Sequence, residues 1–341
     1  MLGIDISEQS VKIAQIGLGG GRRLTTHCWH GVPEGTVQKG EITNQVAMQQ
    51  VLHEALEKCK LPSRKNITVV ASVPETESFL RVIEIPIMEP AEISEAVQWE
   101  VAQHIPFGID NVYVDWQPVR RHKRTTTDRQ EVLVGAAEKR VVDPLYEALH
   151  AVGLDVGALE LESQAIIRAL ISPELQLRKG LLVVDLGGSN TNVIVHDRGT
   201  IRFTASLQRG ASDITQVLSA QELASLAGPV LTDVSKEFPK MEKELEDGML
   251  GLVAEIHGIV EFYTGLDPDN KINELLLTGG GTNLPGLDSA FLKYFDDVHV
   301  QRGSPWVNVL PPGDDTNAPM GVHESVHYAT ALGLAMRQVI V

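Results

Sequence analysis

Two aspartates occupy the same position in two similar stretches of the sequence. Asp5 and Asp185 each lie near the end of a short apolar strand, ahead of a polar turn and a returning strand, and are 180 residues apart. Backbone N–H groups in such turns bind anions, and a carboxylate at a strand end can hold a hydrated Mg²⁺ that bridges phosphate oxygens. The pair therefore predicts a site in which two β-hairpins bind a triphosphate and its Mg²⁺.

The second hairpin has the composition that a phosphate-binding turn requires. Gly187 and Gly188 can adopt positive φ angles and let a phosphate approach the backbone. Ser189, Asn190 and Thr191 add hydrogen-bond donors. We expect these five residues to bind the phosphates of a nucleotide.

The first hairpin is also polar, but its turn contains no glycine. Ser7, Gln9 and Ser10 surround the turn and Lys12 follows on the returning strand, and we expect these four side chains to bind nucleotide. Glu8 places a carboxylate beside the expected phosphates, so the sequence predicts weakened binding. Each hairpin alone is explained as simply by an Asx-type turn between strands, but the pair favours a binding site.

A run of three glycines supplies a third element of the predicted site. Gly279, Gly280 and Gly281 follow the apolar strand 275–277, and Asn283 lies two residues beyond them. Bare glycine backbone lets an adenine ring or a ribose lie against the chain, although a lone glycine triplet is a weak signal. Together the three elements predict ATP and Mg²⁺ as cofactors. We expect Asp5 and Asp185 to hold the metal through water.

The elements that position these residues alternate between strands and helices, which is typical of an α/β fold. The 180-residue offset between the hairpins is too long for a solenoid repeat and indicates two homologous lobes around a cleft. We expect strands at 2–6, 10–18, 68–73, 79–85, 112–119, 131–137, 154–161, 180–186, 192–196, 200–207, 275–277 and 298–300, with those from 154–161 onward in a second series. We expect helices at 44–59, 90–104, 142–152, 163–171, 211–221, 248–264 and 325–339.

Composition narrows the class of protein further. The 341 residues are enough for two compact units, and 43% hydrophobic content excludes a wholly disordered chain. The formal net charge of −16 argues against a nucleic acid partner, because phosphate backbones repel an acidic surface.

Cysteine content and hydropathy bear on the compartment. Cys28 and Cys59 are the only cysteines, and their different contexts lead us to expect neither a disulfide nor a zinc site, which fits a reducing cytoplasm. No apolar run approaches the roughly 20 residues of a membrane helix, and the N-terminus does not resemble a signal peptide. Any association with a membrane is therefore expected to be indirect.

Further segments of the chain carry a resemblance to a known family. They are residues 84–93, 98–107, 255–263, 279–286 and 328–337. In this order, and together with the hairpins, they resemble the type IV pilus assembly protein PilM family and its relative, the cell-division protein FtsA. The resemblance covers nearly the whole chain. It implies a bilobal, duplicated actin-like (ribonuclease H-like) α/β fold with a small extra FtsA/PilM-type subdomain.

The resemblance also implies how the chain is divided. A first actin-like lobe would span 1–150 and contain the extra subdomain at about 85–140. A second lobe would span 151–341, with a C-terminal helix that packs back on the first lobe.

The function that the resemblance implies is that of a cytoplasmic adaptor at the inner face of the inner membrane. Such a protein binds nucleotide and the N-terminal tail of a PilN-like inner-membrane protein, and rapid hydrolysis is not typical. The sequence shows no clear general base, which agrees with slow or absent hydrolysis. Glu162 and Gln164 open a helix that approaches the cleft, but helix capping and burial explain them as simply.

The extra subdomain is the expected binding surface for the tail, and its segment 85–116 is expected to offer strand edges that could accept an added strand. Trp99 lies outside the apolar stripe of its helix, and Phe107 follows in an apolar turn. We predict that Trp99 and Phe107 line a peptide groove, while single exposed aromatic residues are common and Phe107 could equally fill a core.

Other functions share these motifs. A filament-forming actin-like or FtsA-like ATPase would self-associate in response to nucleotide, and an adaptor of a type II secretion system would have a similar sequence. A sugar or acetate kinase would share both hairpins but needs a catalytic acid and a substrate pocket, which we do not find in the sequence.

Overall fold

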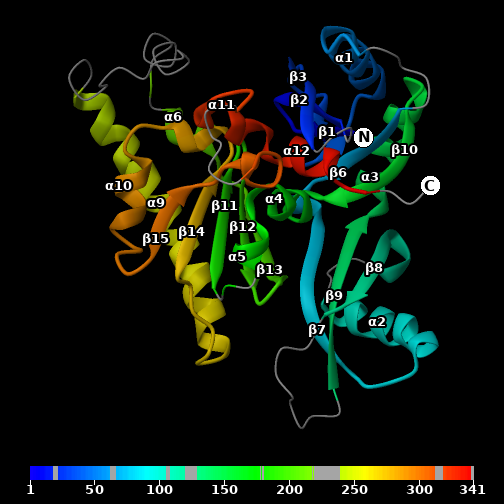
Figure 1. The fold of residues 1–341 in the computed structure, drawn as a ribbon, viewed down its shortest axis with the longest axis vertical. Coiled ribbons are helices and arrows are strands. Elements are labelled where there is room, and N and C mark those ends of the chain that lie inside the picture. The colour runs from blue at the N-terminus through cyan, green and yellow to red at the C-terminus, as the bar shows by residue number, and fades with distance from the viewer. Residues whose placement is uncertain are drawn as a thin grey trace.

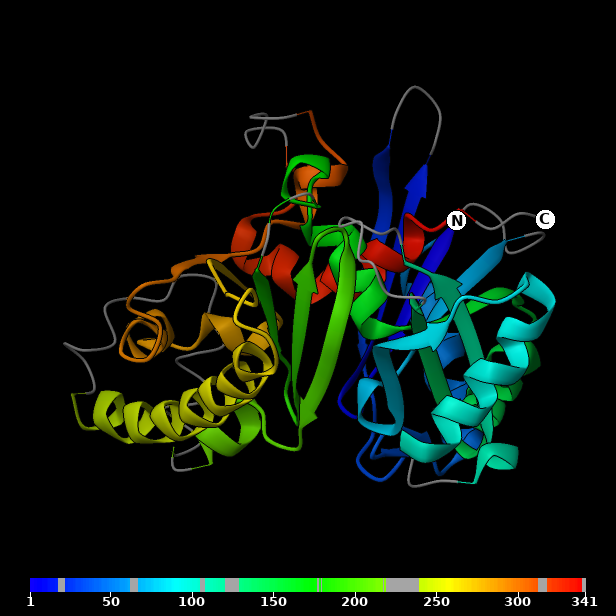
Figure 2. The same cartoon turned by 90° about the horizontal axis from the view of Figure 1, so that it is seen from below.

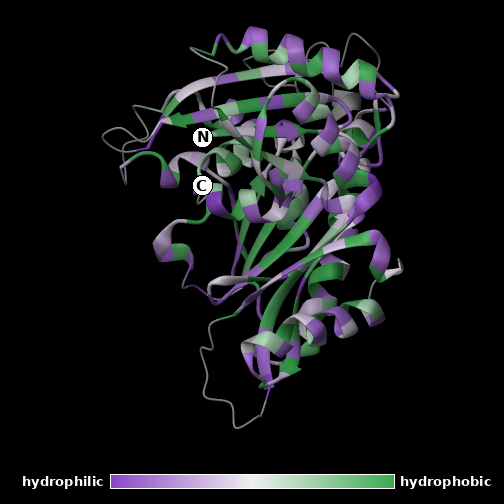
Figure 3. Ribbon diagram, turned by 90° about the vertical axis from the view of Figure 1, so that its right-hand side faces the viewer, coloured by the Kyte–Doolittle hydropathy of each residue, from purple (hydrophilic) through white to green (hydrophobic). Residues whose placement is uncertain are grey.

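The computed structural model of the 341-residue chain describes residues 1–17, 22–61, 67–104, 108–119, 129–176, 178, 180–216, 218, 239–311 and 318–338. Within these residues, two large β-sheets are surrounded by helices (Figure 1). Hydrophobic residues dominate many of the strands, whereas the surrounding helices alternate between hydrophobic and hydrophilic residues (Figure 3).

Five strands form the first sheet. In chain order they are β1 (Leu2–Ile6), β2 (Ser10–Gly17), β3 (Arg23–Gly31), β6 (Thr68–Val73) and β10 (Asp155–Leu161). They lie in the order β10-β6-β1-β2-β3, with β1, β2 and β3 antiparallel and β6 and β10 parallel to β1. The sequence analysis placed the strand at 154–161 in the second series, which is wrong because β10 pairs with β6 along its whole length.

Four helices pack on this sheet. They are α1 (Gln45–Lys58), α3 (Lys139–Ala151), α4 (Glu162–Leu170) and α12 (Ala329–Ala335). α1 begins where expected, because the side chain of Asn44 accepts a hydrogen bond from the backbone N–H of Ala47. The helix expected at 325–339 is instead a short helix and a 3₁₀ turn that lead into α12. α12 packs against β1 and α4.

Eight strands form the second sheet. Its strands in chain order are β7 (Ser78–Pro86), β8 (Val112–Pro118), β9 (Arg129–Glu138), β11 (Leu181–Leu186), β12 (Thr191–Asp197), β13 (Thr200–Leu207), β14 (Glu274–Thr278) and β15 (His299–Arg302). They lie in the order β15-β14-β11-β12-β13-β7-β9-β8. α6 (Ala211–Thr215), α9 (Pro239–Leu266) and α10 (Leu287–Leu292) accompany β11 to β15, and Figure 2 shows the length of α9 beside this sheet.

The strands β7, β8 and β9 and helix α2 (Pro90–His104) form a small unit with its own core. Ile93, Val97 and Val101 of α2 are buried against the three strands, as the apolar stripe predicted. β7 joins β13 through the pairing of Arg81 with Phe203. This unit corresponds to the extra subdomain proposed at about 85–140, and the division into lobes remains a proposal.

The remaining elements are short. They are β4 (Val37–Gln38), β5 (Glu41–Ile42), α5 (Pro173–Gln176), α11 (Val322–Ser325), and the 3₁₀ helices η1 (Glu75–Glu77), η2 (Ile109–Asn111), η3 (Gly280–Asn283), η4 (Pro305–Asn308) and η6 (Val326–Tyr328).

A disulfide joins β3 to the residue that follows α1. Cys28 and Cys59 are bonded, their Cα atoms are 5.3 Å apart, and both side chains are buried. The expectation of no disulfide is therefore wrong. The two cysteines are 31 residues apart in sequence, but α1 packs along β3 and brings its C-terminal end beside Cys28.

Helix α9 contains a long, largely apolar segment. Leu245–Leu266 meets the length and composition of a membrane-spanning helix, with a mean hydropathy of 1.2, and a third of the tested window is buried. Glu255 and Glu261 interrupt its apolar residues. Leu252, Val253 and other inward residues of α9 pack in the core beside the second sheet.

Candidate functional site

The two predicted hairpins border a common cavity of about 360 Å³. In both, the residue opposite the aspartate is polar, since Asp5 pairs with Lys12 and Asp185 pairs with Asn192. Cavities of this size lie within the range of about 300–1,000 Å³ that small ligands occupy. The predicted residues that line it are Asp5, Ser7, Gln9, Ser10, Lys12, Asp185, Gly187, Gly188, Ser189, Asn190, Gly279, Gly280 and Gly281.

Two predicted residues do not line the cavity. The hydroxyl of Thr191 donates to the backbone oxygen of Arg209 at 2.7 Å, which fixes the second hairpin to the end of the β13 connection. The amide of Asn283 donates to the backbone oxygen of His323 at 2.9 Å. Both residues therefore support the walls of the cavity.

The first hairpin carries an ion pair at the cavity wall. Asp5 accepts hydrogen bonds from Ser72 Oγ at 3.0 Å and from Lys12 Nζ at 3.3 Å. Burial lowers the pKa of Lys12, but the charges of Asp5 and Asp185 outweigh burial and raise this pKa above its ordinary value. Lys12 is therefore a permanent cation in the cavity, suited to bind phosphate oxygen.

The charge of Asp185 is only partly compensated. Burial raises its pKa to about 6; Lys12 opposes this shift and Asp5 adds to it. Gly279, at φ +86°, lies directly against Asp185, and a Cβ there would overlap Asp185 Oδ1. A cation beside Asp185 would offset its charge, so the site fits Mg²⁺.

The structure also limits how a metal ion is held. Among the described residues, no group of three or more His, Cys, Asp or Glu side chains is positioned to hold a metal ion. Mg²⁺ commonly keeps several waters and binds one or two carboxylates plus substrate phosphates. Asp5 and Asp185 fit this water-mediated arrangement.

Free backbone donors complete the anion site. The backbone oxygens of Gly187 and Gly188 accept from the N–H groups of Ala211 and Ser212 at 2.9 Å, which holds the second turn on α6. In the described part of the chain, the N–H groups of Gly188, Ser189 and Asn190 have no acceptor. Such a group of unpaired N–H donors is a binding site for phosphate.

Gln9 links the first hairpin to α6 above the second turn. Its Nε2 donates to Ser212 Oγ at 3.0 Å, and a Cβ at Gly188 would overlap the Gln9 side chain. The bond links residues 203 positions apart in sequence. Gln9 is therefore placed to contact both hairpins and any ligand between them.

Glu8 is not where the sequence analysis placed it. Its carboxylate accepts a hydrogen bond from the backbone N–H of Lys39 at 2.7 Å, and it lines a separate cavity of about 160 Å³. Glu8 does not line the main cavity, which argues against the expected repulsion between Glu8 and the phosphates. Ser7, Gln9 and Ser10 do line it, and Ser7 also lines the smaller cavity.

The glycine run has a packing role in addition to lining the cavity. A Cβ at Gly280 would overlap the ring of His327, and a Cβ at Gly281 would overlap the side chain of Leu186. The glycines thus permit close approach of η6 and β11 to η3, which the sequence pattern did not predict.

Glu162 lies in the same cavity at the first turn of α4. Its Oε2 accepts from Asn192 Nδ2 at 2.9 Å and from the backbone N–H of Glu75 at 3.4 Å. Burial raises the pKa of Glu162 well above its ordinary value, and Asp5 and Asp185 raise it further. A shift in this direction disfavours the ionised form that a general base requires.

Sequence reasoning missed several residues of this cavity. Asn192 had a usable signal, because it occupies in the second hairpin the position of Lys12 in the first. The others reach the cavity from elements distant in sequence. They are Trp29, Ala211, Ser212, Thr215, Val326, His327 and Thr330.

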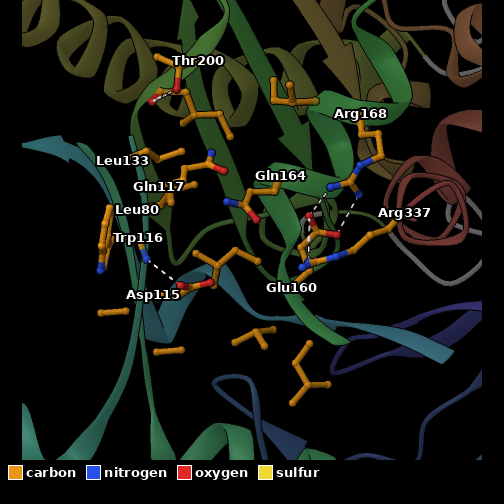
Figure 4. Close-up of a pocket in the computed structure, with 18 of the residues that line it drawn as sticks. Leu80, Asp115, Trp116, Gln117, Leu133, Glu160, Gln164, Arg168, Thr200 and Arg337 are labelled. Atoms are coloured by element: carbon orange, nitrogen blue, oxygen red, sulfur yellow. Dashed lines mark hydrogen bonds and ion pairs between the residues drawn. The ribbon is translucent and has the colours of Figure 1, made fainter. Parts of the chain in front are cut away.

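A second and larger cavity, of about 800 Å³, lies beside the small unit of β7, β8 and β9 (Figure 4). Five consecutive residues of β8, 113–117, line it. Side chains alternate between the faces of a strand, so a continuous run means that the backbone edge of β8 faces the cavity. β8 is the last strand of its sheet.

The backbone of this edge is not paired with another strand in the described part of the chain. Trp116 N–H points away from β9 and donates to the side-chain oxygen of its neighbour Asp115 at 2.9 Å. Trp116 Nε1 donates to Ser94 Oγ of α2 at 3.2 Å, which fixes the indole ring. An open, rigid strand edge of this kind can pair with an added strand.

Trp99 and Phe107 are not shown to lie together. Trp99 is 71% exposed on α2 and lines neither cavity. Phe107 lies outside the described residues. Their role in peptide binding stays a prediction.

Known proteins share the sequence pattern and fold of this chain. The family described as type IV pilus assembly protein PilM matches residues 3–339. Cell division protein FtsA of Neisseria meningitidis serogroup B is 22% identical over 319 residues, which are 80% of this chain and 76% of that protein.

Two solved structures show the same fold. A PilM-PilN type IV pilus biogenesis complex is similar with a TM-score of 0.81 and 24% identity, over 100% of this chain and 98% of the other. MreB 5 of Spiroplasma citri bound to AMPPNP is similar with a TM-score of 0.50 and 12% identity, over 97% of this chain and 93% of the other. The predicted actin-like α/β fold is thereby confirmed.

Proposed function

Because the chain belongs to the type IV pilus assembly protein PilM family, we propose that it is a nucleotide-binding adaptor of the inner-membrane pilus assembly platform. In this role it lies at the cytoplasmic face of the inner membrane and binds the N-terminal cytoplasmic tail of a PilN-like membrane protein. The full-length similarity to a PilM-PilN complex supports a partner of this kind.

The observation that carries the proposal is the presence of two different cavities in one chain. One is small, polar and lined by two hairpin turns with free N–H donors. The other is larger and borders an open strand edge. The first fits a nucleotide, and the second fits an extended peptide.

In the nucleotide cavity, the N–H groups of Gly188, Ser189 and Asn190 and the ammonium of Lys12 would bind phosphate oxygens. Mg²⁺, when bound, would neutralise part of the phosphate charge. Asp5 and Asp185 would hold its waters. The AMPPNP-bound MreB 5 structure has the same fold, which supports an adenine nucleotide.

Hydrolysis in this cavity is expected to be slow or absent. Glu162 lines the cavity and is a candidate to activate water, but burial and the charges of Asp5 and Asp185 raise the pKa of its carboxyl and disfavour the ionised form. Occupancy by nucleotide is therefore the proposed function of the site, and turnover is not.

In the larger cavity, the tail would add as a strand along β8. Val119 N–H donates to the backbone oxygen of Glu131, next to β9. Because N–H groups alternate in direction along an antiparallel strand, those of Val114 and Trp116 point away from β9. The hydrogen bond from Trp116 N–H to the side chain of Asp115 agrees with this direction. Leu80 and Leu133 provide apolar surface for the anchors of the tail. Main-chain hydrogen bonds would give affinity, and these apolar contacts would give specificity.

The exposed Trp99 on α2 is the alternative surface, and one experiment separates the two. A synthetic peptide of the N-terminal tail of the PilN protein from the same organism is titrated into the full chain by calorimetry. Val114→Pro removes an outward N–H and should weaken binding more than about tenfold, while Val114→Thr keeps the N–H and should bind normally. Loss of binding in Trp99→Ala alone would place the tail on α2 instead.

A further inference from the structure

Two helices border both cavities. α4 starts at the nucleotide cavity with Glu162, and just over one turn later Ile167 and Arg168 line the larger cavity. The segment that contains η6 and α12 also borders both cavities. His327 of η6 lines the nucleotide cavity, and Arg337, just beyond α12, lines the larger one. Leu161 and Gln164, on either side of Glu162, also line the larger cavity, so the two cavities lie close together at the start of α4.

The backbones of these elements touch without intervening side chains. A Cβ at Gly333 of α12 would overlap the backbone oxygen of Ala165 in α4. A Cβ at Gly3 of β1 would overlap the backbone oxygen of Ala331 in α12. β1 carries Asp5. Because the backbone of β1 contacts α12 and that of α12 contacts α4, a shift of the first hairpin would displace both helices.

At the larger cavity the two helices meet at one buried carboxylate. Glu160, 4% exposed, forms an ion pair with Arg168 of α4, whose Nη1 also donates to the backbone oxygen of Gly333 at 2.9 Å. Arg337, just beyond α12, forms a second ion pair with Glu160 at 3.4 Å. Figure 4 shows both guanidinium groups directed at Glu160 in the cavity wall.

We propose that α4 and α12, joined at Glu160 by Arg168 and Arg337, couple the two cavities, so that nucleotide and tail peptide bind with positive cooperativity. This inference rests on the proposed function. Each ligand orders the same pair of helices, so the second ligand to bind meets less ordering cost. Coupling between sites is reciprocal, so each ligand should raise the affinity for the other by the same factor.

The test is a binding cycle with the full chain. The PilN tail peptide is titrated by calorimetry with and without saturating Mg-AMPPNP, and Mg-AMPPNP is titrated with and without peptide. In each titration we take the ratio of the affinity with the other ligand present to the affinity without it. We expect both ratios to be about fivefold or more in the wild type. In Arg337→Gln the ratio should fall to one, even where the affinity for peptide alone also changes, because Arg337 lines the cavity.

A matched control removes a different arginine. Arg178→Gln breaks the ion pair with Glu274, and Arg178 lines neither cavity, so this variant should keep the wild-type ratio. Melting temperatures of all three proteins are recorded to show that each is folded during the titrations, because in a partly unfolded protein the first ligand would raise the ratio by stabilising the fold.

The outcomes separate this inference from the proposed function. If either ligand fails to bind the wild type by itself, the proposed function and the coupling both fall. If both bind but the ratio is one or below, only the coupling is overturned. An unchanged ratio in Arg337→Gln would show that the Glu160 cluster is not part of the connection.

Discussion

Replacing Asp185 by asparagine should stabilise the free protein at neutral and basic pH. Burial raises the pKa of this carboxyl from the ordinary value of 3.8 to about 6, so its ionisation is disfavoured in the folded state. At about 1.4 kcal/mol per pKa unit, the shift corresponds to about 3 kcal/mol of lost folding free energy once Asp185 is ionised. The asparagine side chain of the variant carries no charge and avoids this cost.

The sign of the pH dependence follows from the raised pKa. Below pH 3.8 the carboxyl is neutral in both folded and unfolded chains, and the charge costs nothing. Between pH 3.8 and about 6 only the unfolded chain ionises, so wild-type stability falls as pH rises; above 6 the full cost remains. The stability gain of Asp185→Asn should therefore be small near pH 4.5 and largest at pH 8.

Urea unfolding of both proteins at pH 4.5 and pH 8 measures this difference. Asp288→Asn, which changes an exposed aspartate paired with Arg302, is the control and should give the same small change at both pH values. Asp185→Asn should also weaken Mg-nucleotide binding at pH 8, because the charge that destabilises the free protein is the one proposed to hold the waters of Mg²⁺. Equal effects of Asp185→Asn at both pH values, or destabilisation at pH 8, would refute the assigned burial of this charge.

Three further predictions test other parts of the structure. Glu8→Ser should change Mg-ATP affinity by less than about twofold in calorimetry, because Glu8 binds the backbone N–H of Lys39 and faces away from the main cavity; marked tightening would return Glu8 to the phosphates. Reduction of Cys28–Cys59 should lower the free energy of unfolding by about 2–4 kcal/mol, measured by urea unfolding with and without dithiothreitol, and Cys28→Ser should lose this sensitivity. Steady-state phosphate release should remain far below the typical enzyme rate of about 10 per second, because burial raises the pKa of Glu162 and disfavours its ionised form; turnover near that rate would require another base.

The nucleotide cavity could be predicted from sequence because its main parts are local. Each hairpin is a contiguous stretch, and the position of Asp5 relative to Lys12 is repeated by Asp185 and Asn192. The direction of Glu8 could not be predicted, since it depends on Lys39 from a distant loop. β10 pairs with β6 in the first sheet, and α4 follows β10 directly. This places Glu162, the first residue of α4, at the cavity.

The larger cavity could not be predicted, although the segment 85–116 was expected to offer strand edges for an added strand. Its walls come from β8, α4 and the end of α12, which lie far apart in the sequence, and the exposed edge of β8 exists only once the strand order is known. Cys28 and Cys59 show the same limit, because only the packing of α1 along β3 brings them together. The apolar stripe of α2, in contrast, followed directly from residue spacing.

The most direct test of the account is amide hydrogen exchange of the full chain with and without the PilN tail peptide. We predict that the peptide slows exchange at Val114 and Trp116 on β8, whose N–H groups point away from β9, and leaves the exposed face of α2 around Trp99 unchanged. Absence of protection anywhere in the chain, or protection confined to α2, would contradict the proposed adaptor surface.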